Sequence, residues 1–132
     1  MADIPAAARH LLEGQHFAHV ATLNPDGSPQ VSPVWVGIEG DAITFNTAAG
    51  RIKSRNLGDD PRVAISIVNQ ENPYESLIVQ GRVTEITHEG ADEDIDALAK
   101  RYMGLDEYPM HRAGEERLLV KVEPEKVMHM AP

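Results

Sequence analysis

The chain contains no cysteine among its 132 residues. This absence excludes disulfide bonds, thiolate metal sites and cysteine nucleophiles, so the compartment must be judged from other features. Long apolar runs are also missing, because no segment approaches the roughly 18 apolar residues of a membrane-spanning helix. The N-terminus has no basic region followed by an apolar run, which a secretory signal would need. We therefore expect a cytoplasmic protein without a membrane partner.

Positive charge is scarce. The chain has 12 lysine and arginine residues against 21 aspartate and glutamate residues, which gives a formal net charge of −9 at pH 7. Such a surface repels nucleic acid and anionic membranes over most of its area. Nucleic acid is therefore not an expected partner, and any anionic ligand must be held by a local group of cations.

Motifs of hydrolytic and metal sites are also missing. No Gly-x-Ser-x-Gly pattern occurs, which disfavours a serine-triad hydrolase. The six histidines are scattered, and His16 and His19 would point to opposite faces of a strand. We expect no metal site, and no side chain stands out as a covalent catalyst.

The apolar patterns indicate one domain over residues 1–132 with a mainly β (α+β) fold. We expect helices at 4–13, from about 50 to 57, and at 91–103, the first of them capped by Asp3. Strands are expected at 16–23, 30–38, 42–47, 62–68, 76–87 and 116–123. A turn at Asn24–Gly27 joins the first two strands as a hairpin. Six short strands with few helices favour an antiparallel β-barrel or a strongly curved sheet over regular βαβ units.

Proline and glycine positions predict irregularities in these strands. Pro29 and Pro33 cannot donate ladder hydrogen bonds, so their strand should have a free edge or a bulge near Pro33. Gly81 lies inside a long strand and indicates either a bulge or a close backbone approach. Pro124 is expected to stop the last strand.

The segment Gly50–Leu57 gathers three of the twelve cations directly after an apolar strand. Small residues at 47–50 would let a ligand approach the backbone, and the following helix start attracts phosphate. Arg51 and Lys53 converge only if the chain is still unwinding from the strand at this point. Arg55 would then be a surface charge or a partner of Asp59 or Asp60. The segment is therefore a phosphate anchor or, alternatively, a solvated basic helix face.

Two further residues permit two interpretations each. Trp35, the only tryptophan, could flank a planar ligand beside the interrupted ladder or serve as an ordinary core or interface aromatic. Gln80 could bond the edge of a ligand from within its strand or face solvent.

Three stretches carry a resemblance to a known family, namely Ala21–Trp35, Phe45–Leu57 and Asp60–Val63. In their order they resemble the pyridoxamine 5′-phosphate oxidase-like flavin and deazaflavin proteins, most of all the short actinobacterial branch that uses coenzyme F420. The resemblance implies a six-stranded split barrel and a homodimer with the cofactor at the subunit interface. Longer members carry a basic and aromatic C-terminal segment for pyridoxal phosphate, which is not found at residues 128–132. That difference counts against vitamin B6 oxidation.

The resemblance also implies roles for individual residues. Arg51 and Lys53 match the pair that holds the cofactor phosphate. Asn46 and Thr47 match the strand end beside this pair, and the strand that lines the ring is matched by Ser32, Pro33, Val34 and Trp35. Gln80 matches a ring contact from the long strand. Tyr74 matches a residue that reaches the cofactor of the opposite subunit.

The function implied is an F420-dependent oxidoreductase that transfers a hydride between the deazaflavin and a small conjugated or heteroaromatic substrate. One alternative is an FMN-dependent oxidoreductase on the same fold. F420 has additional carboxylates in its tail, which would favour a further cation such as Arg55 near the phosphate. Another alternative is a non-enzymatic protein that binds a flavin, F420 or a haem-like ligand.

Overall fold

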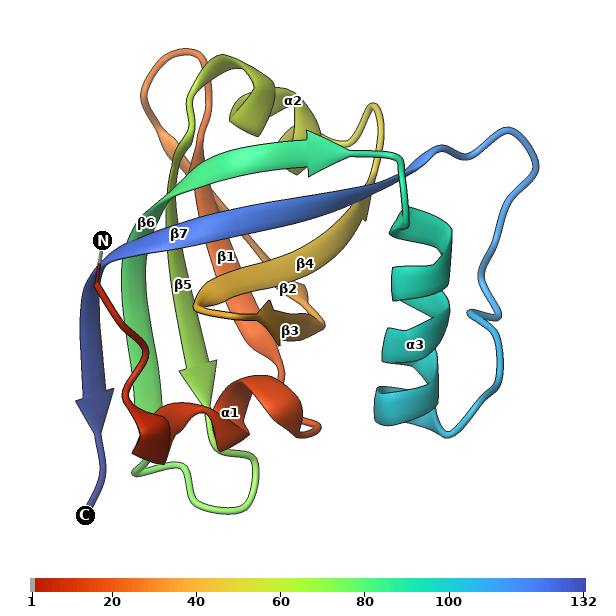
Figure 1. Cartoon of the computed structure of the whole chain (residues 1–132). Coiled ribbons are helices and arrows are strands. Elements are labelled where there is room, and N and C mark those ends of the chain that lie inside the picture. Colours follow the sequence, from red (N-terminus) through yellow and green to blue (C-terminus); the bar gives the residue numbers. More distant parts are fainter. Residues whose placement is uncertain (1) are drawn as a thin grey trace.

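The computed structural model describes residues 2–132, and an antiparallel sheet dominates it (Figure 1). The seven strands are β1 (Ala18–Leu23), β2 (Pro29–Val34), β3 (Val36–Glu39), β4 (Ala42–Ala48), β5 (Arg62–Val68), β6 (Ser76–Thr87) and β7 (Arg117–Met130). The helical elements are the 3₁₀ turn η1 (Ala6–Ala8) and the α-helices α1 (His10–Glu13), α2 (Ile52–Asp59) and α3 (Ala91–Met103). The expected helix at 91–103 is confirmed, and the helix expected from about 50 to 57 runs instead from Ile52 to Asp59.

The strands form one sheet in the order β2-β1-β5-β6-β7-β4-β3, and all neighbours are antiparallel. The two end strands, β2 and β3, are separated in the chain by Trp35 alone. The sheet therefore curls back on itself as a split barrel, which confirms the expected fold class (Figure 1).

The strand count is seven rather than six, because the segment expected as one strand at 30–38 changes partner at Trp35. β2 pairs with β1, whereas β3 pairs with β4. β2 lies at one end of the sheet, so the free edge predicted from Pro33 is confirmed. A proline there lacks only a hydrogen bond that an edge strand does not need.

The core fills the inside of this curved sheet. Alternate residues of the strands are buried, as in Val63, Ile65 and Ile67 of β5. Leu11 and Leu12 of α1 are fully buried in the same cluster.

The helix expected at 4–13 is wrong in detail. The chain forms η1 and then α1, with no side-chain cap at either start, so Asp3 does not cap a helix. Short helices derive their stability mainly from packing, and here Ile4, Ala8 and the two leucines of α1 are buried.

The last strand was expected to end before Pro124, and this expectation is wrong. β7 continues to Met130, and the β6–β7 register shifts so that Gly81 faces Pro124 while Gln80 faces Lys126. The bulge accommodates the missing N–H of the proline. A Cβ on Gly81 would lie 2.5 Å from the carbonyl oxygen of Glu123, so the close backbone approach predicted for this glycine is confirmed.

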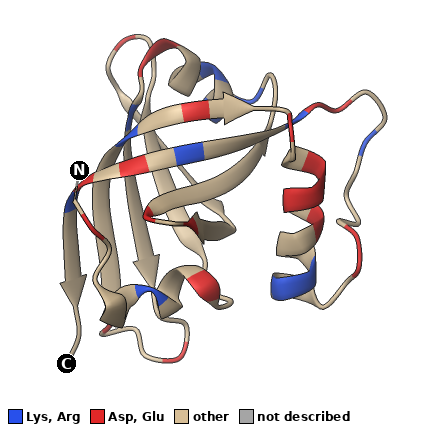
Figure 2. Cartoon of the chain, viewed as in Figure 1, with Lys and Arg blue, Asp and Glu red and all other residues tan. Residues whose placement is uncertain are grey.

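α3 packs against β4 and β7 outside the barrel. Its first turn is acidic and its last turn is basic, an arrangement that stabilises the helix dipole (Figure 2). At its C-terminal end, Arg101 donates to the carbonyl oxygens of Leu12 and Gly14, at 2.9 and 3.1 Å, and to that of Val36, at 2.6 Å. In the part of the chain that the structure describes, no helix combines the length and apolar character needed to cross a membrane.

Candidate functional site

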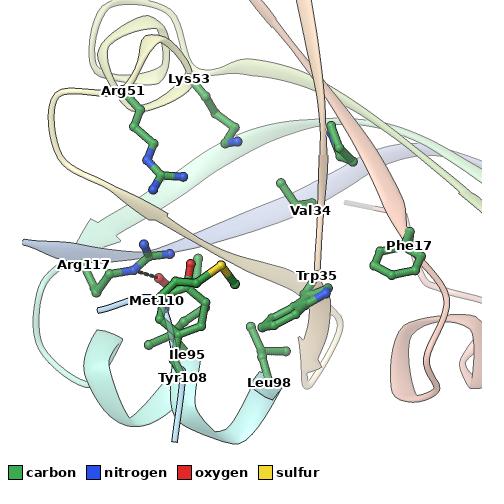
Figure 3. Close-up of a pocket in the computed structure, with 12 residues that line it drawn as sticks. Phe17, Val34, Trp35, Arg51, Lys53, Ile95, Leu98, Tyr108, Met110 and Arg117 are labelled. Carbon is green, nitrogen blue, oxygen red and sulfur yellow. Dashed lines mark hydrogen bonds between the residues drawn. The ribbon is translucent and has the colours of Figure 1, made fainter. Parts of the chain in front are cut away.

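A cavity of about 240 Å³ lies where the start of α2, the β2–β3 junction, α3 and the segment before β7 meet. One side is cationic and is formed by Arg51, Lys53 and Arg117. The other side is largely apolar and includes Val34, Trp35, Ile95, Leu98 and Met110 (Figure 3). The cavity therefore has a cationic end and an apolar wall.

The local backbone explains why Arg51 and Lys53 share this cavity. Arg51 is still extended, with φ −73° and ψ 157°, and α2 begins only at Ile52. Both side chains extend from this turn toward the cavity (Figure 3). The chain is therefore not yet helical at Arg51, which is the condition predicted for Arg51 and Lys53 to converge. Binding of phosphate by the pair stays a prediction.

Lys53 is buried, with 8% of its surface exposed. Its Nζ donates a hydrogen bond to Ser32 Oγ at 2.9 Å. Burial, followed by the charges of Arg51 and Arg117, lowers the pKa of Lys53 below its ordinary value of 10.5. Within residues 2–132, no carboxylate forms an ion pair with it. The charges that act on Lys53 are thus those of two arginines, and a buried cation without a carboxylate partner is a candidate for binding an external anion.

Arg117 is the cation that sequence reasoning missed. It is 3% exposed, and its Nε donates to Asn46 Oδ1 at 2.8 Å. Asn46 is fixed in turn, because its Nδ2 donates to the carbonyl oxygen of Ala91 and to Asp94 Oδ2. Burial raises the pKa of Asp94. Asn46 therefore lies beside the cations, as expected, and orients one of them.

Aromatic rings form a continuous group beside the apolar wall. Trp35 stacks on Tyr102 with ring centroids 5.2 Å apart and planes 9° apart, and Phe17 packs on the same tyrosine. Tyr108 meets Trp35 edge-on, and the Arg117 guanidinium lies 5.2 Å from the Tyr108 ring centroid. Both interpretations of the tryptophan find support, since it packs in an aromatic group and also lines the cavity.

The segment between α3 and β7, residues 104–116, closes one side of the cavity with Tyr108 and Met110. Asp96 of α3 fixes this segment by accepting hydrogen bonds from the backbone N–H of Tyr108 at 2.8 Å and from His111 Nε2 at 3.1 Å. The Tyr108 bond, followed by the His111 bond, lowers the pKa of Asp96. The sequence predicts no helix and no site residue in this segment, because nothing in it shows which way its side chains turn.

Most of the remaining candidates lie away from the cavity. Pro33 lines the cavity, but Thr47 does not, and its buried hydroxyl has no hydrogen-bond partner among the described residues. Tyr74 lies in the β5–β6 loop with 80% of its surface exposed. Arg55 is exposed and does not line the cavity, and Asp60 pairs with Arg62 instead of with it.

Gln80 lies on the outer face of the sheet. It forms a cross-strand row with Ala64, Ala21 and Val31, and it lines a second cavity of about 380 Å³ there. The same face exposes apolar side chains on four strands, namely Val31, Val68, Ile78, Met128 and Met130. We call it the outer apolar face.

A model of the pyridoxamine 5′-phosphate oxidase family matches residues 4–131. The chain belongs to this family. A solved structure that carries the name F420 Reductase is 34% identical, covers 95% of this chain and is itself covered to 98%, with a TM-score of 0.83. The family resemblance expected from the sequence motifs is confirmed.

More distant solved structures show the same fold. A conserved hypothetical protein from Mycobacterium tuberculosis is 20% identical, with coverage of 98% of this chain and 86% of that one and a TM-score of 0.75. HupZ from Group A Streptococcus is 22% identical, with coverage of 96% and 93% and a TM-score of 0.69. At these identities the likeness concerns the fold alone.

Proposed function

We propose that this chain is an F420-dependent oxidoreductase that transfers a hydride between the deazaflavin cofactor and a small conjugated or heteroaromatic substrate. One observation carries the proposal: in a chain with net charge −9, three cations meet at one end of a cavity whose other side is apolar. Membership of an oxidase family and the 34% identical relative named F420 Reductase support oxidoreductase chemistry.

The residues present fit a phosphate-bearing planar cofactor. Arg51 and Lys53 would hold the phosphate, since the buried lysine has no carboxylate partner among the described residues. Pro33, Val34 and Trp35 would lie along the ring. When bound, the cofactor supplies the hydride chemistry, whereas the chain binds it, orients it and excludes water.

We further propose a homodimer with the ligand at the subunit interface. A volume of about 240 Å³ is less than the roughly 300 to 1,000 Å³ typical of complete ligand pockets. A second copy on the outer apolar face would enlarge the site and cover the exposed apolar side chains. Gln80 and Tyr74, which lie outside the cavity, would contact the ligand of the partner in such a dimer.

The exposure of Arg55 favours FMN as a second candidate cofactor. F420 carries tail carboxylates that would suit an additional cation near the phosphate, but Arg55 does not line the cavity. The phosphate of FMN would need only the cations already present there.

Direct titration separates these possibilities. Oxidised and reduced F420, FMN and FAD are each titrated into the purified protein, followed by turnover assays with several acceptors. We expect micromolar or tighter binding of F420. If none of the three cofactors binds with at least micromolar affinity, the cofactor proposal is wrong. Tight binding without turnover would point to a storage or sensing protein.

The site assignment is tested with the Arg51→Ala/Lys53→Ala double variant. We expect it to bind the cofactor more weakly by about 2 to 5 kcal/mol, because two charge-assisted hydrogen bonds are lost. Lys100→Ala is the matched control, since it removes an exposed cation of α3 that does not line the cavity. An unchanged affinity of the double variant would contradict the assignment.

A further inference from the structure

Glu115 forms a bridge between two of the three cations of the cavity. Its Oε2 lies 3.7 Å from Arg51 Nη2, and its Oε1 accepts a hydrogen bond from Arg117 Nη1 at 3.2 Å. The carboxylate is largely buried, with 11% of the side chain exposed. A phosphate or carboxylate of a ligand would contact the same guanidinium groups in the same manner.

The two contacts of Glu115 differ in strength. The Arg117 side chain is 3% exposed and is also held by Asn46, so this pair stays in place. The Arg51 side chain is 52% exposed and its contact is longer, so this pair is weak and easily exchanged. An arriving anion can therefore take Arg51 from Glu115 while Arg117 keeps its partner.

We propose that Glu115 determines how tightly the site binds an anion, by acting as an internal counterion of Arg51 that the ligand must displace. The inference rests on the proposed function only for the identity of the ligand. Arg51, Lys53 and Arg117 supply three positive charges, and Glu115 cancels one of them. The ligand thus meets two uncompensated charges and competes for the third.

Glu115→Gln tests the proposal because it removes the charge and keeps the shape. We expect the variant to bind FMN, F420 and inorganic phosphate about three- to tenfold more tightly at low salt, since competition for Arg51 and repulsion of the ligand both disappear. The gain should shrink as salt rises. Glu116→Gln is the matched control: it removes the same charge one residue away, where the side chain is exposed and forms no ion pair among the described residues.

A double-variant cycle shows whether Glu115 acts through Arg51. In an Arg51→Ala background, Glu115→Gln should give a clearly smaller gain in phosphate affinity, because only the repulsion of the ligand by Glu115 is left to remove. A gain of the same size in that background would overturn the proposal, as would unchanged or weaker binding by the single variant. Thermal unfolding of each variant verifies that it is folded.

Failure of the cofactor proposal gives a different result. If neither F420 nor FMN binds the wild type but Glu115→Gln binds phosphate more tightly, the proposed function is wrong and the role of Glu115 stands. If a cofactor binds the wild type and Glu115→Gln does not strengthen that binding, the role of Glu115 is wrong and the function stands.

Discussion

Replacing Lys53 by methionine should affect stability and binding in opposite directions. In the free protein, the lysine is a buried cation close to two arginines, and its one described hydrogen bond goes to Ser32. Lys53→Met loses that bond, which contributes about 1.5 to 3 kcal/mol because its donor is charged, but it also removes the desolvation of an ammonium group and its repulsion by Arg51 and Arg117. We expect the ligand-free variant to be as stable as the wild type or more stable by about 1 kcal/mol.

Ligand binding should suffer instead. A hydrogen bond to a charged group contributes about 1.5 to 3 kcal/mol, so the loss of the ammonium should weaken phosphate-bearing ligands by about thirtyfold. At a ligand concentration of 100 times the wild-type Kd, the ligand stabilises the wild type by about 2.7 kcal/mol. The same concentration would stabilise Lys53→Met by only about 0.9 kcal/mol. In a chain of this size the difference corresponds to a shift in Tm of roughly 5 to 10 °C.

Thermal and urea unfolding, with and without FMN or F420, measure both effects. The pH dependence provides a further readout. Because the pKa of Lys53 is lowered in the folded state, the unfolded chain holds this proton more tightly, and stability should rise as the pH increases toward 10.5. Lys53→Met should lack this rise, whereas the exposed-site control Lys100→Met should keep it. A ligand-free Lys53→Met variant that is clearly less stable and binds ligand normally would refute the reasoning.

Three further predictions concern the barrel and its loops. Gly81→Ala should lower the free energy of unfolding, measured in urea, by about 2 to 4 kcal/mol, because its Cβ would press on β7. Gly58→Ala is the control: it lies in a helix with open space around it and should raise the free energy of unfolding by up to about 1 kcal/mol. Glu75 is bonded by a loop asparagine and two histidines that hold its pKa at about 2, so stability should fall as the pH drops from about 4.5 toward 2, and Glu75→Gln should flatten that part of an acid titration. Asp96→Ala should release residues 104–116, which would shift the emission of Trp35 and weaken ligand binding; an unchanged emission spectrum would show that Asp96 does not hold the segment.

Local sequence carried enough information to predict two of the three cations that line the cavity. Arg51 and Lys53 are two residues apart, and the glycine before them together with the late start of α2 determines their directions. Arg117 could not be found in this way, because its contact with Asn46 spans 71 residues and depends on how β4 and β7 pair. A lone arginine at the start of a strand gives no sign that it will be buried.

The errors in the strands have a similar origin. The break at Trp35 is not caused by a strong turn signal but by a change of pairing partner, which only the closure of the barrel requires. Pro124 looked like a strand end because a regular ladder has no place for it. The bulge opposite Gly81 provides that place. The sequence indicated an irregularity at Gly81, but it did not show that Pro124 lies opposite this glycine.

Both free borders of the open sheet are protected against unwanted growth. β2 carries two prolines, and the outward N–H and C=O of Val36 in β3 are already bonded by Tyr102 and Arg101. Foreign chains therefore find few unpaired backbone groups to which they could add as extra strands, the usual start of fibril-like aggregation. The homodimer that we propose would use the broad side of the sheet instead, where contacts between side chains can be selective.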